Sequence, residues 1–186
     1  MSVEALRGTN ESFNPFFRKV RPHTGQMESA ENILHFLSSS KLVRPNDGSE
    51  EFSQSQDRYS IRAAPQWVGP YIEDIHLTYH QITVELNSVT DNPLFDDGKY
   101  LHGGNFQAKC ITTAMEKTRQ SYQSIGQMLF AQCTELIDPL TNQGLAPNLV
   151  ADGPNESWMW KGTDIMIAAL QSELGLLANP VGIHVQ

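Results

Sequence analysis

The sequence has no long hydrophobic run and few basic residues. No stretch approaches the roughly 18 consecutive apolar residues of a membrane span, and the opening MSVEALRGTNESF lacks the basic-then-apolar order of a signal peptide. With 13 Lys and Arg against 21 Asp and Glu, the formal net charge of −8 repels nucleic-acid phosphates. We therefore expect a folded, soluble, cytoplasmic chain with no membrane or nucleic-acid partner, and no metal site is predicted.

Cysteine is also scarce, since Cys110 and Cys133 are the two thiols of the chain. Both fall in one predicted helix. At a rise of 1.5 Å per residue they lie about 34 Å apart, far beyond the ~7 Å limit between the Cα atoms of a disulfide. We predict two unpaired thiols in a reducing compartment.

Apolar residues recur in steps of three and four over three long segments, which predicts the helices of a bundle. The first stripe extends from Val68 to Val89, the second from Ile111 to Leu136, and the third from Met166 through Leu170 and Glu173 or Leu174 to Leu177. A shorter helix is predicted over 25–37, with Thr24 as its N-cap. The predicted fold class is all-α, a long-helix bundle with no substantial sheet.

Helix breakers separate these segments at 90–105, at 138–155 and at Asn179-Pro180. The apolar faces of such long helices need more partners than this chain supplies. We therefore expect residues 1–186 to form a single partial helical domain that associates with itself or with another chain. The alternative is a four-helix unit closed on itself, because bundles of this size do fold alone.

The segment QDRYSIRAAPQWVGP, residues 56–70, places three hydrogen-bonding side chains ahead of an expected Pro-Gln-Trp turn. Gln56, Tyr59 and Arg62 are three residues apart, so one helical turn would point them the same way. The planar guanidinium of Arg62 suits a carboxylate. This spacing indicates a small-anion site, and the alternative is that Arg62 ties a loop to a helix through Asp57.

Two further segments have the composition of ligand-binding loops. Gly103 and Gly104 permit backbone conformations closed to other residues, and they present Phe106 near a helix entrance. Asn92 precedes Pro93, which favours an extended backbone at the asparagine. The alternative for Asn92 is a capping or turn role.

Four segments, taken together, resemble the aromatic amino-acid ammonia-lyases, and the phenylalanine ammonia-lyases in particular. They are QDRYSIRAAPQWVGP, NSVTDNP, LHGGNFQ and LANPV followed by HVQ, and the resemblance extends from Arg7 to Gln186. Trp67–Pro70, Gln107 and Lys161 resemble the phenylalanine and tyrosine branch rather than the histidine branch. The implied fold is part of the central helical core of these enzymes.

The resemblance implies that six residues line the site of an aromatic amino acid: Gln56, Tyr59, Arg62, Asn92, Phe106 and Lys161. Arg62 would bind the substrate carboxylate, with Asn92 in support. Tyr59 would be catalytic, and both Gln56 and Tyr59 would form hydrogen bonds near the prosthetic group and the amine. Phe106 would pack beside the reacting centre, and Lys161 would lie on the polar side of the pocket.

The resemblance also implies a methylidene-imidazolone prosthetic group, made in this family from an internal Ala-Ser-Gly. No Ala-Ser-Gly occurs in these 186 residues. By the same resemblance, a loop with a catalytic tyrosine would precede Met1, and a pocket glutamate would follow Gln186. We therefore expect ammonia elimination from L-phenylalanine, giving trans-cinnamate for secondary (phenylpropanoid) metabolism, only with complementary sequence or subunits.

The implied assembly is a homo-oligomer, a homotetramer by family, or a hetero-oligomer with a longer relative. One alternative is a non-catalytic helical protein that binds or regulates full-length ammonia-lyases. Another is a bundle that binds an aromatic acid or performs acid-base chemistry through Tyr59. An unperturbed phenol, with a pKa of about 10, is a poor base at neutral pH.

Overall fold

The computed structural model describes residues 1–44, 56–153 and 157–184, and it is predominantly helical. Val185 and Gln186 of the HVQ motif and the last positions of the 138–155 breaker lie outside the described residues. The long helices are α5 (Ala64–Leu86), α6 (Lys109–Ile137) and α7 (Thr163–Leu177). The predicted all-α class is confirmed, because the strands of the described part form only one two-stranded hairpin, β1 (Leu94–Asp96) with β2 (Lys99–Leu101).

The shorter elements are α1 (Ser2–Ala5), η1 (Glu11–Phe13), α2 (Pro15–Val20), α3 (Thr24–Leu37), α4 (Tyr59–Arg62) and η2 (Pro147–Leu149). The prediction that Thr24 caps α3 is wrong, because His23 precedes the helix and Thr24 is its first residue. The side chain that satisfies the helix start comes from α5. The N–H of Gly25 donates to Glu73 Oε1 at 2.8 Å.

Helix α5 begins earlier than its apolar stripe indicates. The expected Pro-Gln-Trp turn is wrong, because Pro65 lies in the first turn of the helix, where the missing N–H of proline has no intrahelical partner to lose. The helix ends at Leu86, so Val89 is outside it. The predicted segment is therefore a helix, shifted by about one turn toward the N-terminus.

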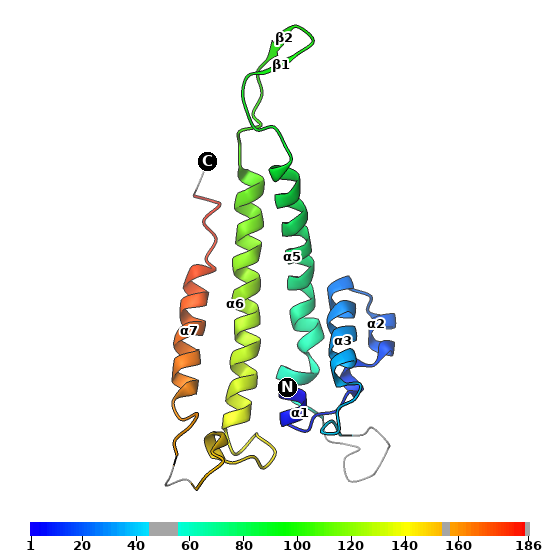
Figure 1. The fold of residues 1–186 in the computed structure, drawn as a ribbon, viewed down its shortest axis with the longest axis vertical. Helices are drawn as coiled ribbons and strands as arrows, with labels where there is room; N and C mark the ends of the chain where they lie inside the picture. The colour runs from blue at the N-terminus through cyan, green and yellow to red at the C-terminus, as the bar shows by residue number, and fades with distance from the viewer. Residues whose placement is uncertain (45–55, 154–156, 185–186) are drawn as a thin grey trace.

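The four longer helices lie side by side in one open layer, in the order α3, α5, α6, α7 (Figure 1). Packing joins α3 to α5, α5 to α6, and α6 to α7. The alternative of a four-helix unit closed on itself is therefore wrong for the described residues. Both faces of the layer are left open, and the hairpin projects from its α5–α6 end as an arm (Figure 1).

Small side chains, rather than the predicted stripes, pack α5 on α6. Thr78 is buried and its hydroxyl donates to the carbonyl of Ala114 at 3.1 Å, while Ser121 and Ser124 of α6 are also buried. Several large stripe residues face outward, and those of α6 are Met115, Tyr122 and Leu129. On α7, which has no buried residue, Leu174 faces Gly126 of α6. Much of each stripe is thus left uncovered by the described residues, although Leu136 and Leu174 pack within the chain.

The apolar core lies at the end of the layer opposite the hairpin. Its buried members come from the N-terminal elements and α4, and they are Leu6, Phe13, Ala30, Leu37 and Ile61. Partly buried apolar residues pack around them, namely Val3, Ile33, Leu34, Val43 and Leu136. Because Ile61 belongs to this cluster, the one-turn helix α4 is anchored where α1, α3 and the last turn of α6 meet.

Both cysteines lie in α6, as predicted, and both are free thiols. A hydrogen bond from Cys110 Sγ to Glu85 Oε2, at 3.3 Å, raises the pKa of the Cys110 thiol. None of the described helices combines the length and apolar character needed to cross a membrane.

The segment after α7 is clamped to α6 by one carboxylate. Glu116 accepts hydrogen bonds from the backbone N–H of Val181, at 2.6 Å, and from that of Gly182. Nη2 of Arg119 lies 3.9 Å from Glu116 Oε1. Lys109 donates to the Gly182 carbonyl. The Gly182 hydrogen bond lowers the pKa of Glu116, with further lowering by Val181, Arg119 and Lys109.

Substituting Gly25 tests the close approach of α3 to α5. A Cβ on Gly25 would lie 2.8 Å from the carbonyl carbon of Gly69 and closer still to its oxygen, so Gly25→Ala forces two backbones apart. We expect a loss of about 1–3 kcal/mol in the free energy of unfolding, measured by urea denaturation. The control Gly175→Ala has open space in α7 and should stabilise by roughly 0.5–1 kcal/mol. Equal effects of the two variants would refute the close contact.

The Glu116 clamp predicts a pH dependence of amide exchange. Because the pKa of Glu116 is lowered in the folded chain, its contribution to stability is present above the ordinary glutamate value of about 4.3 and is lost as pH falls through the lower folded value. Protection of the Val181 and Gly182 amides, relative to intrinsic exchange, should follow this pattern. Glu116→Ala should lose the protection at neutral pH, whereas Glu173→Ala on α7 should not. Persistent protection in Glu116→Ala would contradict the clamp.

Candidate functional site

Gln56, Tyr59 and Arg62 form one cluster at the start of α5, as their spacing predicts. The guanidinium carbon of Arg62 lies 4.6 Å from the centre of the Tyr59 ring, a cation–π contact. Nη1 of Arg62 donates to Gln56 Oε1. The single turn of α4 places the phenol and the guanidinium on the same side, and the hydrogen bond to Arg62 brings the amide of Gln56, ahead of α4, to them.

The alternative pairing of Arg62 with Asp57 is not what the described contacts show. The Asp57 side chain is nearly buried. It accepts a hydrogen bond from the backbone N–H of Thr9 at 2.8 Å and one from the guanidinium Nη2 of Arg44 at 3.0 Å. Asp57 therefore joins the segment ahead of α4 to the N-terminal loop. Arg62 lines a small hollow of about 140 Å³ together with Gln56 and Phe17, so its guanidinium remains accessible to a ligand.

A second hollow, of about 300 Å³, lies beside Tyr59. Ala63, Trp67 and Met128 line it, and its surface is mostly apolar. The Trp67 indole N–H donates to the Ser124 carbonyl of α6 at 2.8 Å, which fixes the ring against that helix. An apolar hollow next to an exposed phenol and a guanidinium can hold an aromatic ring with a carboxylate.

Asn92 and Phe106 lie at the other end of α5, at the base of the hairpin arm. Asn92 Oδ1 accepts the Gly103 N–H at 2.8 Å, so this side chain bridges the two sides of the loop, and its peptide bond to Pro93 is cis. Phe106 is exposed. The expectation of special conformations at Gly103 and Gly104 is wrong, because neither has a positive φ and the space around each is open.

Lys161 belongs to neither group. It lies two residues ahead of α7, and its ammonium is 3.9 Å from the centre of the Trp158 ring. Because α7 packs on α6, Lys161 comes from a third part of the layer.

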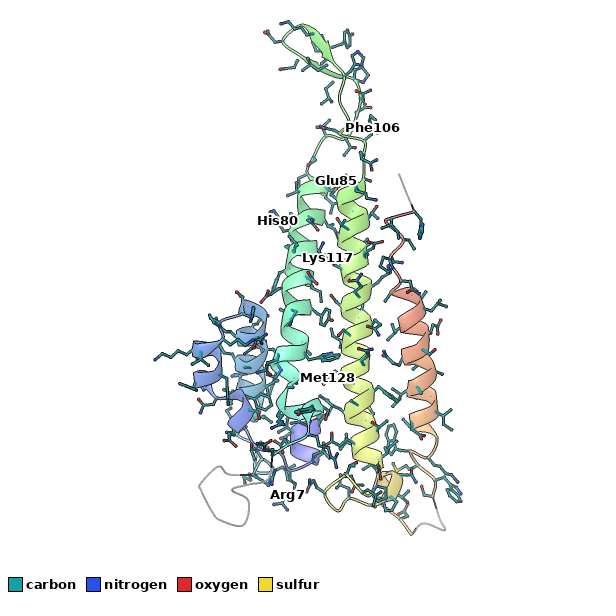
Figure 2. The ribbon with its side chains drawn as sticks, turned by 180° about the vertical axis from the view of Figure 1, so that it is seen from behind. Arg7, His80, Glu85, Phe106, Lys117 and Met128 are labelled. Carbon is teal, nitrogen blue, oxygen red and sulfur yellow. The ribbon has the colours of Figure 1, made fainter. Side chains whose placement is uncertain are left out.

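The predicted site residues therefore do not form one pocket within one chain. Arg62 precedes α5 and Asn92 follows it, and the 23 residues of this helix span about 33 Å, far more than the length of an amino acid. Figure 2 shows the same separation, with Phe106 near the arm and Met128, which lines the hollow beside Tyr59, toward the opposite end of α6.

Sequence reasoning missed the contacts that hold α4 on α6. Ser60 Oγ donates to Glu135 Oε2, and the Gln132 amide donates to the Ser60 carbonyl at 2.8 Å. Gln132 and Glu135 are three residues apart and so share a face of α6. Two polar residues at this spacing near the end of an apolar stripe are the signal that could have indicated the contact.

Comparison with known proteins places these features in one family. The family model described as aromatic amino acid lyase matches residues 1–186. A phenylalanine ammonia-lyase of Aspergillus hancockii is 55% identical over 190 residues, and a phenylalanine aminomutase of Talaromyces islandicus, the type forming L-beta-phenylalanine, is 52% identical over 191. Each alignment covers 100% of this chain and 27% of the relative.

Solved structures agree with the sequence relatives. The phenylalanine ammonia-lyase of Rhodosporidium toruloides superposes with a TM-score of 0.92 at 43% identity, over 100% of this chain and 28% of that one. The phenylalanine aminomutase of Pantoea agglomerans gives 0.93 at 27% identity, over 98% and 39%. The chain thus spans between a quarter and two-fifths of the length of these proteins. With its helical core and the family match over residues 1–186, the chain belongs to the aromatic amino acid lyase family.

Proposed function

We propose that the chain is the central part of a phenylalanine ammonia-lyase-like enzyme, a single partial helical domain over residues 1–186. It would eliminate ammonia from L-phenylalanine to give trans-cinnamate, together with complementary sequence or subunits. The observation that carries this proposal is the cluster of Gln56, Tyr59 and Arg62 beside an apolar hollow, in a chain that matches the family over its whole length.

Each group in the cluster suits one part of an aromatic amino acid. The guanidinium fork of Arg62 would bind the carboxylate through two parallel hydrogen bonds. The ring would enter the apolar hollow against Trp67 and Met128. The Tyr59 hydroxyl, on the same face of α4, would hydrogen-bond with the substrate amino group and hold or return a proton there.

The donor set of this cluster fits the prosthetic group of the family. The exposed phenol of Tyr59 and the amide of Gln56 are neutral hydrogen-bonding groups, next to one cation, and would lie beside a small electrophilic ring. When bound, the methylidene-imidazolone supplies the electrophile that lets ammonia leave. Its Ala-Ser-Gly precursor is not in these 186 residues, so the precursor would come from complementary sequence.

The separation of the candidate residues supports a site shared between chains. Two copies of α5 packed antiparallel would place Arg62 of one copy beside Asn92 and Phe106 of the other. The outward-facing residues Tyr79 and Tyr122, 74% and 60% exposed, provide apolar surface on α5 and α6 for such contacts. We therefore propose that the chain assembles as a homotetramer, or as a hetero-oligomer with a longer relative.

Two alternatives differ from this proposal in their products. The similarity to the Talaromyces islandicus aminomutase makes an amino-group shift that gives β-phenylalanine a second candidate reaction. A non-catalytic partner of full-length relatives would give neither product. Cinnamate formation would support the main proposal. We further propose that the enzyme acts in the cytoplasm, in secondary metabolism.

Replacing Arg62 tests the carboxylate role. A hybrid enzyme is made by substituting this chain for the matching segment of the Rhodosporidium toruloides ammonia-lyase, and cinnamate is followed by ultraviolet absorbance. Arg62→Lys keeps the charge but loses the fork, worth roughly 1.5–3 kcal/mol, so kcat/KM should fall about ten- to more than a hundredfold. Arg18→Lys, at an exposed pair with Glu31, is the control and should change nothing. A lower Tm with unaltered kcat/KM would remove Arg62 from the site.

Mixing two inactive variants tests the shared site. In the hybrid enzyme, Arg62→Ala and Asn92→Ala should each be nearly inactive. Refolding them together should restore partial activity, because some sites then receive Arg62 from one copy and Asn92 from another. Mixing after separate assembly is the control and should restore none. No recovery on joint refolding, with intact oligomers, would refute a site that combines Arg62 of one copy with Asn92 of another.

A further inference from the structure

Helix α4 is too short to hold its own orientation. It has four residues, and isolated helices shorter than about 12 residues are marginal in water. Its two faces differ sharply, since Ser60 and Ile61 are buried whereas Tyr59 is 73% exposed. The direction in which Tyr59 and Arg62 point therefore depends on what holds the buried face.

The apolar contact of Ile61 fixes the depth of α4 but not its rotation, because burial of apolar surface is non-directional. Polar contacts with α6 are directional and so can fix the rotation. Glu135 accepts from the Ser60 hydroxyl through Oε2, and its Oε1 lies 3.7 Å from Arg58 Nε. Glu135 is itself 10% exposed, so this carboxylate is largely shielded from competing water.

A second residue of α6 holds the backbone of the same turn. Gln132 Nε2 donates to the Ser60 carbonyl at 2.8 Å, and Gln132 Oε1 accepts from the Ser2 hydroxyl at the same distance. The amide of Gln132 is thus held at both ends. With Glu135 it contacts a side-chain atom and a main-chain atom of Ser60, and two such contacts define an orientation.

We propose that Glu135, supported by Gln132, is a positioning residue for the ligand-binding face of α4. It holds Ser60 and Arg58 on α6 so that Tyr59 and Arg62 stack on one another and face outward. This inference rests on the proposed function for the meaning of that face, but the geometry itself can be tested without activity. A residue that merely stabilised the fold would leave the Tyr59–Arg62 stack intact.

The stack provides a spectroscopic signature in the 186-residue chain. Protons on the Arg62 side chain lie over the Tyr59 ring, so their NMR resonances are displaced upfield by the ring current, and Tyr59→Leu assigns the effect. Glu135→Ala should abolish the displacement. Glu135→Gln should retain most of it, because the amide oxygen can still accept from Ser60. Glu173→Ala, at an exposed carboxylate on α7, is the matched control and should leave the displacement unchanged.

Ser60→Ala provides a second route if Glu135→Ala fails to fold. It removes only the hydroxyl that donates to Glu135, and it should reduce the displacement while the amide resonances of α5 and α6 remain in place. An unchanged displacement in a folded Glu135→Ala or Ser60→Ala chain overturns the proposal. So does the lack of any upfield displacement in the unaltered chain.

Kinetics of the hybrid enzyme give an independent readout. Since Arg62 would bind the carboxylate, Glu135→Ala should raise KM for phenylalanine about tenfold, the loss expected for one misplaced charge-assisted hydrogen bond, with a smaller change in kcat. Glu135→Gln should recover most of this loss. An unchanged KM in Glu135→Ala would overturn the positioning role. A hybrid that makes no cinnamate even without substitution would instead count against the proposed function, while the NMR result still decides the role of Glu135.

Discussion

The burial of Ile61 in the core cluster is the contact on which the candidate site depends. A four-residue helix gains too little from its own hydrogen bonds to persist, so α4 depends on the burial of Ile61 in one cluster with Leu6, Phe13 and Leu37. That core is built from the N-terminal elements and the end of α6. Segments far apart in the chain thus hold Tyr59 and Arg62 in place together. The position of these two residues therefore depends on the stability of the core.

The two ends of α5 carry chemically different groups, and the length of the helix keeps them apart. One end has the guanidinium and phenol of α4, and the other has the hairpin arm with Asn92 and Phe106. A rigid helix cannot bring its own ends together, so residues from both ends can serve one ligand only when different copies meet. The exposed apolar residues on the faces of the layer are consistent with the proposed association, because no described part of the chain covers them.

The sequence predicted what depends on near neighbours and missed what depends on distant ones. The stripes indicated the long helices, and the three-residue spacing of Gln56, Tyr59 and Arg62 indicated a shared face, because both follow from helical geometry. The contact surface of α5 with α6 was not predictable in this way, since small residues such as Ala114 and Ser121 give no periodic apolar signal. The roles of the six site residues came from the resemblance to a family rather than from periodicity.

The motif that begins at Gln56 shows why neighbours in sequence can differ in role. Asp57 is nearly buried and joined to Arg44, and Ser60 is buried against α6, whereas Tyr59 and Arg62 face outward. In a helical turn residues three apart share one face and those between them lie on another, so a dense run of polar residues divides into groups that hold the segment and groups that meet a ligand. The many hydrogen-bonding side chains of this segment are thus needed to hold it in a fixed orientation. A short element that presents a cation and a phenol to a ligand needs polar anchors behind it, because a non-directional core contact alone would let it rotate.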